Sequence, residues 1–224
     1  MGARADSVPR APAWDPVPSP LYRRLGRRLG GRRRLRIARD AASCQVDLSG
    51  GVEAFLARRS RGFRSGLRAD RRRVHGAGIA FDYEAPADPA SALRRILELE
   101  ARGWKEAAAQ GIFQSPRPRR FYGDLFARAA AAGRLRTIFA QREGVDVAYA
   151  VGGLAGTTYR GYQMTYAQEH ARLGIGNVTQ LEMMERLAAE GVVRLFDLGM
   201  EVEYKRRWED RRLRFSTVLI LPAP

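Results

Sequence analysis

The stretch YRGYQMTYAQEHARLGIGNVTQLEMMERLAAEGVVRLFDLGMEVEYKRRW, residues 159–208, decides the fold of this chain. It predicts an aromatic strand that ends near Ala167, a glycine-bearing loop, a long helix and a second strand over 192–198. The helix stops at Gly191, a residue typical of left-handed helix caps. Apolar residues recur at every third position of the helix, namely Val178, Leu181, Met184 and Leu187. The order of elements indicates a mixed α and β fold.

The loop between the first strand and the helix is a candidate anion site. The first amides of a helix have no intrahelical acceptor, and the helix dipole adds partial positive charge there. Glycines let the backbone approach a bound group closely. We therefore expect a phosphate-bearing ligand at this turn. The residues expected to bind it are Arg172, Leu173, Gly174, Ile175, Gly176 and Asn177.

The end of the second strand gathers polar residues in one small region. These are Asp197, Glu201, Glu203, Tyr204 and Lys205. We expect the chemistry to lie there, beside the phosphate turn.

Length and composition set broad limits. The chain has 224 residues, of which 45% are hydrophobic, so it is long enough to bury a core in one domain or two small halves. No run of 18 apolar residues and no signal peptide are seen, and a cytoplasmic location is expected. The single cysteine, Cys44, is expected to be a small buried residue, and with only two histidines no metal site is expected.

The formal charge of +16 is concentrated in the first third of the chain. Residues 1–73 hold 19 arginines against 6 acidic residues, a net charge of +13, whereas the remainder carries +3. This distribution indicates either a solvated arginine-rich surface or a surface in region 23–73 for tRNA or another anionic partner. Of the 40 basic residues only Lys105 and Lys205 are lysines, which draws attention to both.

Along the rest of the chain, residues 1–40 form a proline- and arginine-rich, flexible segment with a short basic helix within 21–39. A strand is expected at 45–48, followed by one helix over 52–74, and another strand is expected at 78–84. Helices follow from Pro89 and over 120–133. Three strands with tight joints at 143–144 and 155–156 then form an antiparallel meander, and the last strand covers 215–221.

Several stretches carry a family resemblance. They are SRGFRSGLRADRRRV (60–74), LEARGWK (99–105), FYGDL (121–125), YRGYQMTYAQEHARLGIGN (159–177) and FDLGMEVEYKRRW (196–208). With them the chain resembles the GNAT acyltransferase superfamily. More narrowly, it looks like the CelD-type acetyltransferase-like domain of bacterial polysaccharide and cell-envelope gene neighbourhoods, a relative of the Fem-type transferases. The resemblance covers about residues 46–221 and implies a largely antiparallel central sheet flanked by helices, so we expect one GNAT-like domain over 46–224.

This resemblance implies an acyltransferase that uses acetyl-CoA or another acyl-CoA as cosubstrate. Pantetheine would lie along the strand at Met164 and Thr165, and a carboxylate among Asp197, Glu201 and Glu203 would take the acceptor's proton. Tyr204 or Tyr166 would return a proton to the leaving thiolate. In Fem-type relatives a similar lysine assists the transfer, which makes Lys205 the favoured catalytic residue. The substrate-binding candidates are Trp104, Lys105, Tyr162, Arg64 and Arg68.

The chain departs from the family pattern in two ways. GNAT enzymes usually carry Gln/Arg-x-x-Gly-x-Gly/Ala, and here the arginine, Arg172, stands one place later in that frame. Only about 45 residues precede the resemblance, whereas such relatives usually carry a further half. This leaves open either a truncated start or a minimal form whose missing half comes from the partner in a homodimer.

Three functions are therefore compared. The first transfers an acyl group from acyl-CoA to an amine or hydroxyl on a small molecule, glycan or peptide. The second uses aminoacyl-tRNA as donor, with residues 23–39 and 58–73 as the RNA surface. The third is a non-catalytic scaffold built from a degenerate acyltransferase.

Overall fold

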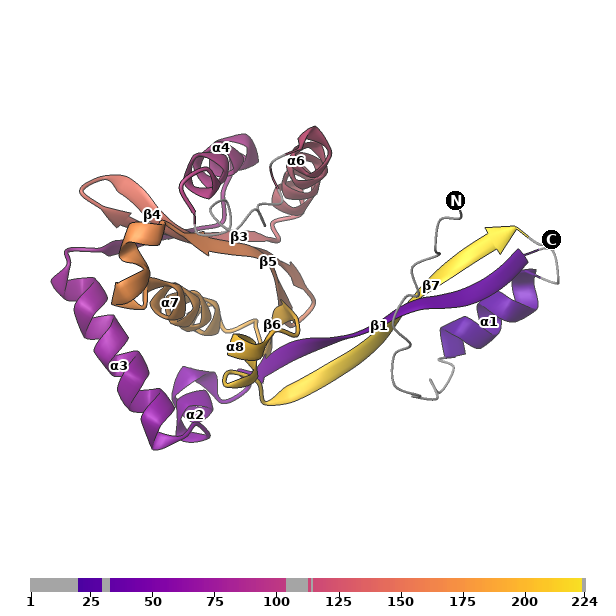
Figure 1. The fold of residues 1–224 in the computed structure, drawn as a ribbon, viewed down its shortest axis with the longest axis horizontal. Coiled ribbons are helices and arrows are strands. Elements are labelled where there is room, and N and C mark those ends of the chain that lie inside the picture. The colour runs from indigo at the N-terminus through magenta and orange to yellow at the C-terminus, as the bar shows by residue number, and fades with distance from the viewer. Residues whose placement is uncertain (1–19, 30–32, 104–112, 114, 223–224) are drawn as a thin grey trace, which may run out of the picture. The chain divides into compact units, whose positions relative to one another are not determined.

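The computed structural model describes residues 20–29, 33–103, 113 and 115–222. The chain divides into two compact units (Figure 1). One comprises residues 41–215, and the other comprises 1–40 together with 216–224. The candidate site belongs entirely to the unit 41–215.

A seven-stranded sheet has the order β2-β3-β4-β5-β6-β1-β7. Its strands are β1 (Arg33–Asp47), β2 (Ala80–Glu84), β3 (Leu135–Arg142), β4 (Val145–Ala155), β5 (Thr158–Tyr166), β6 (Leu195–Met200) and β7 (Arg211–Pro222). The pairs β2–β3, β3–β4, β4–β5 and β1–β6 are antiparallel, whereas β5 and β6 run parallel. The predicted mixed, largely antiparallel sheet is confirmed.

The antiparallel meander turns where the sequence predicts. Between β3 and β4, Glu143 and Gly144 have φ values of 51° and 77°, as two-residue hairpin turns require. Gly156, with φ of 59°, turns the chain from β4 into β5. These short joints hold the three strands in consecutive order.

Helices cover both faces of this part of the sheet (Figure 1). On one face, α4 (Pro89–Glu100) and α6 (Pro116–Ala131) pack on Phe139 and Tyr149 through Ile96 and Phe126. The other face carries the helices α2 (Gly51–Ala57), α3 (Arg61–Gly76) and α7 (Ile175–Ala189). Pro89 occupies the first turn of α4 as predicted, with the side chain of Asp88 capping that helix.

The long helix α7 confirms the three-residue spacing of apolar residues. Val178, Leu181, Met184 and Leu187 are all buried. The chain leaves this helix through Gly191, whose φ of 73° is left-handed. Burial of α7 on the sheet fixes the position of its N-terminus, where the phosphate turn is predicted.

Two predicted elements differ from the structure. The single helix expected over 52–74 is two helices, because the Ser60 side chain accepts a hydrogen bond from the Phe63 amide and starts α3 as a new helix. Part of the expected loop before α7 is a 3₁₀ helix, η2 (Gln168–Leu173). Strand β1 also begins twelve residues before the expected start at 45.

The N-terminal unit contains the helix α1 (Pro20–Leu29), which confirms the predicted basic helix within 21–39. Residues 33–40 are strand, whereas residues 1–19 lie outside the described part. Among the described residues no helix has the length and apolar character needed to cross a bilayer.

Candidate functional site

A cavity of about 740 Å³ opens where β5 and β6 separate. The two strands pair only through Thr158–Arg160 and Leu195–Asp197, although β5 continues to Tyr166 and β6 to Met200. Beyond the paired residues, both strands line the cavity, together with the start of α7 and the segment after β6. Beyond Arg160, β5 has no β6 partner, so its backbone groups on that side are candidates for a ligand that enters between the strands.

A bulge in β5 shapes one wall of this cavity. Val151 pairs with Gln163 and Gly152 with Gly161, so Tyr162 has no partner across the ladder. The Tyr162 ring lies over Gly153, where a Cβ would come within 2.9 Å of the ring. The bulge thus directs strand β5 along the cavity.

The cavity lining is cationic and contains no carboxylate among the described residues. Its charged residues are Arg160, Lys205 and Arg207. Its remaining lining is aromatic, apolar or amide-bearing, with Tyr162, Gln163, Met164, Tyr166, Asn177, Gln180, Tyr204 and Trp208 among its members. This chemistry suits a ligand with an apolar part and a negatively charged or carbonyl-rich part.

Lys205 lies at the end of β6. It is the third residue of the short helix α8 (Glu203–Arg206), and its Nζ donates to the carbonyls of Leu198 at 2.7 Å and Met200 at 3.1 Å. These bonds fix the ammonium group at the mouth of the separated strands. Tyr204 beside it also lines the cavity; partial burial and the neighbouring Tyr166 raise the pKa of the Tyr204 hydroxyl, which stays protonated.

A second cation, Arg160 of β5, is held from behind. Its Nη1 donates to Asp197 at 2.6 Å and to Ser43 at 2.8 Å. Burial raises the pKa of Asp197, but hydrogen bonds from Ser43, from the Gly199 amide and from Arg160 outweigh burial and hold it below its ordinary value. Asp197 is therefore an ionised anchor for Arg160.

The two cations converge over Gly199. A Cβ on this glycine would lie 3.7 Å from Lys205 Nζ and 3.9 Å from Arg160 Nη2. Gly199 has φ of 83°, a left-handed backbone conformation that favours glycine. Two cationic side chains therefore meet at one point of the cavity, and one of them, Arg160, is paired with Asp197.

The predicted phosphate turn lies on the same cavity. Gly174 (φ of 75°), Gly176 and Asn177 line it, and the Asn177 side chain accepts a hydrogen bond from Arg207 at 2.8 Å. Arg207 follows α8, so this bond ties the end of β6 to the start of α7. Asn177 also donates to Asp70 of α3 at 2.8 Å, and the Asp70 carboxylate lies against Gly174.

Gln180 adds a polar group farther along α7. It is 6% exposed and lines the cavity, and its Nε2 has no hydrogen-bond partner among the described residues. A buried amide without an acceptor is costly in a folded protein, so this donor indicates a place for a ligand oxygen.

The structure brings together part of the predicted site. Of the predicted residues, those that line the cavity are Tyr162, Met164, Tyr166, Gly174, Gly176, Asn177, Tyr204 and Lys205. Thr165 and Ile175 are fully buried, Leu173 packs against the core, and Arg172 is exposed on η2 outside the cavity lining. Trp104 and Lys105 lie outside the described residues.

The three carboxylates expected as general bases lie outside the cavity lining. Asp197 is enclosed by its hydrogen bonds, and Glu201 forms ion pairs with Arg206 and Arg212. Glu203 is exposed on α8. The geometry therefore gives these carboxylates no direct access to a bound acceptor.

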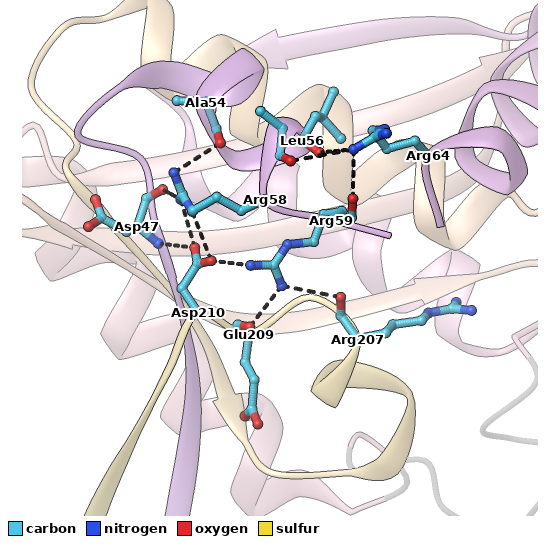
Figure 2. Close-up of polar contacts among 10 residues, drawn as sticks. Asp47, Ala54, Leu56, Arg58, Arg59, Arg64, Arg207, Glu209 and Asp210 are labelled. Atoms are coloured by element: carbon cyan, nitrogen blue, oxygen red, sulfur yellow. Dashed lines mark hydrogen bonds and ion pairs between the residues drawn. The ribbon is translucent and has the colours of Figure 1, made fainter. Parts of the chain in front are cut away.

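Most described arginines near α2 and α3 serve the fold (Figure 2). Arg58 and Arg59 both bond the Asp210 carboxylate, and Arg64 donates to the Arg59 carbonyl at 2.7 Å. Arg64 is therefore a cap for the end of α2, outside the cavity lining. Arg68 is exposed on α3 and also lies outside that lining.

Cys44 is fully buried, as expected for a small apolar residue, and burial is the main cause that raises its pKa to about 12. Within the described residues no cluster of His, Cys, Asp and Glu is suited to hold a metal ion.

Sequence reasoning missed several lining residues. They are Arg160, Gln163, Gln180, Arg207 and Trp208. Arg207 and Trp208 belong to the quoted EYKRRW ending, so the family resemblance of that ending could have identified them as site residues. Gln180 is a polar residue within the buried helix α7, which was a second signal.

Comparison with known proteins defines the family. A family model described as "Acetyltransferase (GNAT) domain" matches residues 61–206. This match covers well over half of the chain and includes every residue of the cavity lining except Arg207 and Trp208. The chain belongs to the GNAT acetyltransferase family. A search of curated proteins finds no significant match.

Solved structures share the GNAT fold at low sequence identity. FemX is 11% identical with a TM-score of 0.61, over 80% of this chain and 61% of FemX. The C-terminal domain of a lysylphosphatidylglycerol synthetase from Agrobacterium fabrum is 13% identical with a TM-score of 0.58, over 84% of this chain and 61% of that domain. A tandem GNAT protein from the clavulanic acid biosynthesis pathway is 15% identical with a TM-score of 0.50, over 98% and 62%. The chain thus spans about three fifths of each.

Proposed function

We propose that this GNAT protein transfers an acyl group, in the first place acetyl, from acyl-CoA to an amine or hydroxyl acceptor. The observation that carries the proposal is the cavity between the separated strands β5 and β6, with Lys205 and Arg160 converging over Gly199. An open, cationic cavity favours catalysis over a scaffold whose site has degenerated.

The donor thioester would lie along β5 between Gly161 and Tyr166. Backbone amides of that strand and the ammonium of Lys205 would stabilise the negative charge that develops on the thioester oxygen. The acceptor would attack the thioester carbon, its proton would pass to solvent, and the carbon–sulfur bond would break to release the thiolate. Tyr204, whose pKa is raised by partial burial, is the candidate that gives this thiolate a proton.

No carboxylate lines the cavity among the described residues, so the acceptor reacts best when it is already neutral. For an amine acceptor, the rate of transfer should then rise with pH until the amine itself is deprotonated. From the family resemblance we propose that the acceptor is a glycan, a peptide or a small molecule of cell-envelope or polysaccharide metabolism.

The test is acyl transfer from a panel of acyl-CoAs to a mixture of amines and alcohols, for wild type and Lys205→Ala. Loss of the Lys205 ammonium should lower kcat/KM by roughly a hundredfold, the size of effect seen when one charge-stabilising donor is removed. Glu203→Ala, two residues away on α8 and outside the cavity lining, is the matched control and should keep wild-type activity. Absence of transfer by wild type with every donor would refute the proposal.

A second candidate donor is aminoacyl-tRNA. The exposed arginines favour it, since Arg23, Arg24, Arg27 and Arg28 of α1 and Arg61, Arg68 and Arg72 of α3 are all exposed. Binding of a tRNA should weaken steeply between about 50 and 200 mM salt, because phosphate contacts release counterions. Binding of coenzyme A should change little over the same range. Tight tRNA binding at low salt, with transfer from aminoacyl-tRNA alone, would select this second donor.

A further inference from the structure

A carboxylate already occupies the edge of the turn where GNAT proteins would be expected to meet a donor's phosphates. The side chain of Asp70 on α3 is 14% exposed and lies directly against Gly174. A Cβ on Gly174 would stand 2.6 Å from Asp70 Oδ1, so only glycine leaves room for this contact. Gly174 therefore accommodates an internal anion as well as a left-handed backbone.

Hydrogen bonds hold this carboxylate in place. Asp70 accepts from Asn177 Nδ2 at 2.8 Å, and Arg73 on the same helix pairs with its other oxygen. Asn177 is oriented in turn by Arg207, which donates to Asn177 Oδ1. The hydrogen bonds Arg207–Asn177–Asp70 thus connect the segment that follows α8 to the turn and to α3.

The N-terminus of α7 favours the binding of one anion at a time. The amides of Ile175 and Gly176 open α7 and have no intrahelical acceptor, and the helix dipole attracts negative charge there. Asp70 already supplies a negative charge beside this end. A diphosphate brought to the same turn would meet a like charge at short range, which disfavours binding.

An independent feature shows that the same wall of the cavity is built for a ligand. Gln180 lies one helical turn beyond Gly176 on α7, and its buried Nε2 has no partner among the described residues. The polar wall of α7 thus begins with an occupied turn and continues with an unsatisfied donor facing the cavity.

We infer that Asp70 is an internal competitor of the donor's diphosphate and thereby sets the affinity of this protein for coenzyme A. The inference rests on the proposed function only for the place where the donor binds. When the diphosphate binds, Asp70 would release Asn177 and remain paired with Arg73, three residues along the same helix. Asn177 and the first amides of α7 would then be available to the phosphates.

The test compares the dissociation constants of coenzyme A and of pantetheine, which lacks the phosphates, for the full chain at fixed ionic strength. Asp70→Asn keeps the shape but removes the charge, and should bind coenzyme A roughly tenfold more tightly than wild type. Pantetheine should bind both proteins equally. Asp70→Glu keeps the charge and should show no gain.

The matched control is Asp124→Asn on α6, an exposed aspartate whose replacement changes the net charge equally. It should leave both dissociation constants unchanged. Asp70→Ser serves as a second neutral variant, and thermal unfolding identifies any variant that fails to fold.

Equal affinity of wild type and the folded neutral variants for coenzyme A would overturn the inference, as would an equal gain for pantetheine or for Asp70→Glu. Absence of measurable coenzyme A binding in all folded variants would overturn it too. The readout is binding, so a tenfold gain without any acyl transfer would support the role of Asp70 and count against the proposed function alone.

Discussion

At the scale of single residues, the site depends on charges that are fixed by their neighbours. Lys205 is positioned by two main-chain carbonyls, and Arg160 is positioned by the buried carboxylate of Asp197. Asp197 illustrates how a residue predicted to be catalytic can support the site from behind. Its oxygens accept from Ser43, the Gly199 amide and Arg160, which leaves it poorly suited to take a proton.

Replacement of Asp197 by Asn should lower the free energy of unfolding on the order of 2 kcal/mol at pH 7, because charge-assisted hydrogen bonds are lost. The pKa of Asp197 is lowered in the folded state from its ordinary 3.8. Its stabilising contribution is therefore fully present above about pH 4 and is lost as the pH falls through the folded-state pKa. Urea unfolding of wild type and variant at pH 7, 5 and 3 measures this, and a difference in stability that does not shrink toward pH 3 would contradict it.

Tyr204 offers a separate test of the proton donor. Tyr204→Phe keeps the ring but removes the hydroxyl, and should lower kcat roughly tenfold to a hundredfold with little change in KM. The decline of the wild-type rate at high pH, where the hydroxyl with its raised pKa loses its proton, should vanish in the variant. The pH–rate profiles of both proteins decide this, and identical profiles would exclude Tyr204 as the donor.

At the scale of elements, one carboxylate joins the connection between α2 and α3 to the segment that follows Trp208. Asp210 accepts from Arg58 and Arg59 and from the Asp47 amide, and its side chain is 13% exposed (Figure 2). Arg59 also donates to the Glu209 carbonyl at 2.8 Å. The contact therefore stabilises the segment that follows Lys205 and Arg207.

Removal of this carboxylate in Asp210→Ala should cost about 3 kcal/mol of folding free energy, because the partly buried Arg59 loses its counter-charge. Asp124→Ala, at an exposed position on α6, should change stability by less than about 0.5 kcal/mol. Denaturant unfolding of both variants measures the difference. An Asp210→Ala protein as stable as the control would show that the arginine cluster is only a solvated surface.

Much of the fold could be predicted because it depends on local patterns. The spacing of Val178 and Leu181 identified α7, and Gly191 marked its end. The antiparallel meander could be predicted because the glycines at its turns, Gly144 and Gly156, are also a local pattern. The break between α2 and α3 was missed although Ser60 is a typical helix cap, because the arginine run continues across it.

The site could be predicted only in part because its key contacts join distant positions. Asp70 and Asn177 are 107 positions apart, and Ser43 and Asp197 are 154 apart. Nothing in the local sequence indicates that one carboxylate meets a helix N-terminus or that another is enclosed by hydrogen bonds. The sequence shows which side chains of the site are charged, but it does not show which of them reach the cavity.

At the scale of the whole molecule, the proposed function depends on the opening between β5 and β6 in the sheet of the unit 41–215. The strands β5 and β6 start as a parallel pair and then separate, and α7 and the segment 199–208 complete the walls. This arrangement places the predicted phosphate turn and the two converging cations on a single cavity. A donor that reaches both must lie across the opening.

The structure of the protein with a bound acyl thioester tests this most directly. The structure to solve is that of the Asp70→Asn variant with a nonhydrolysable acetyl-CoA analogue. The carbonyl group that replaces the thioester should lie beside β5 at Gly161–Tyr166, with Lys205 Nζ on the side of β6. Density for the analogue at any other surface, with the opening between β5 and β6 empty, would contradict the account.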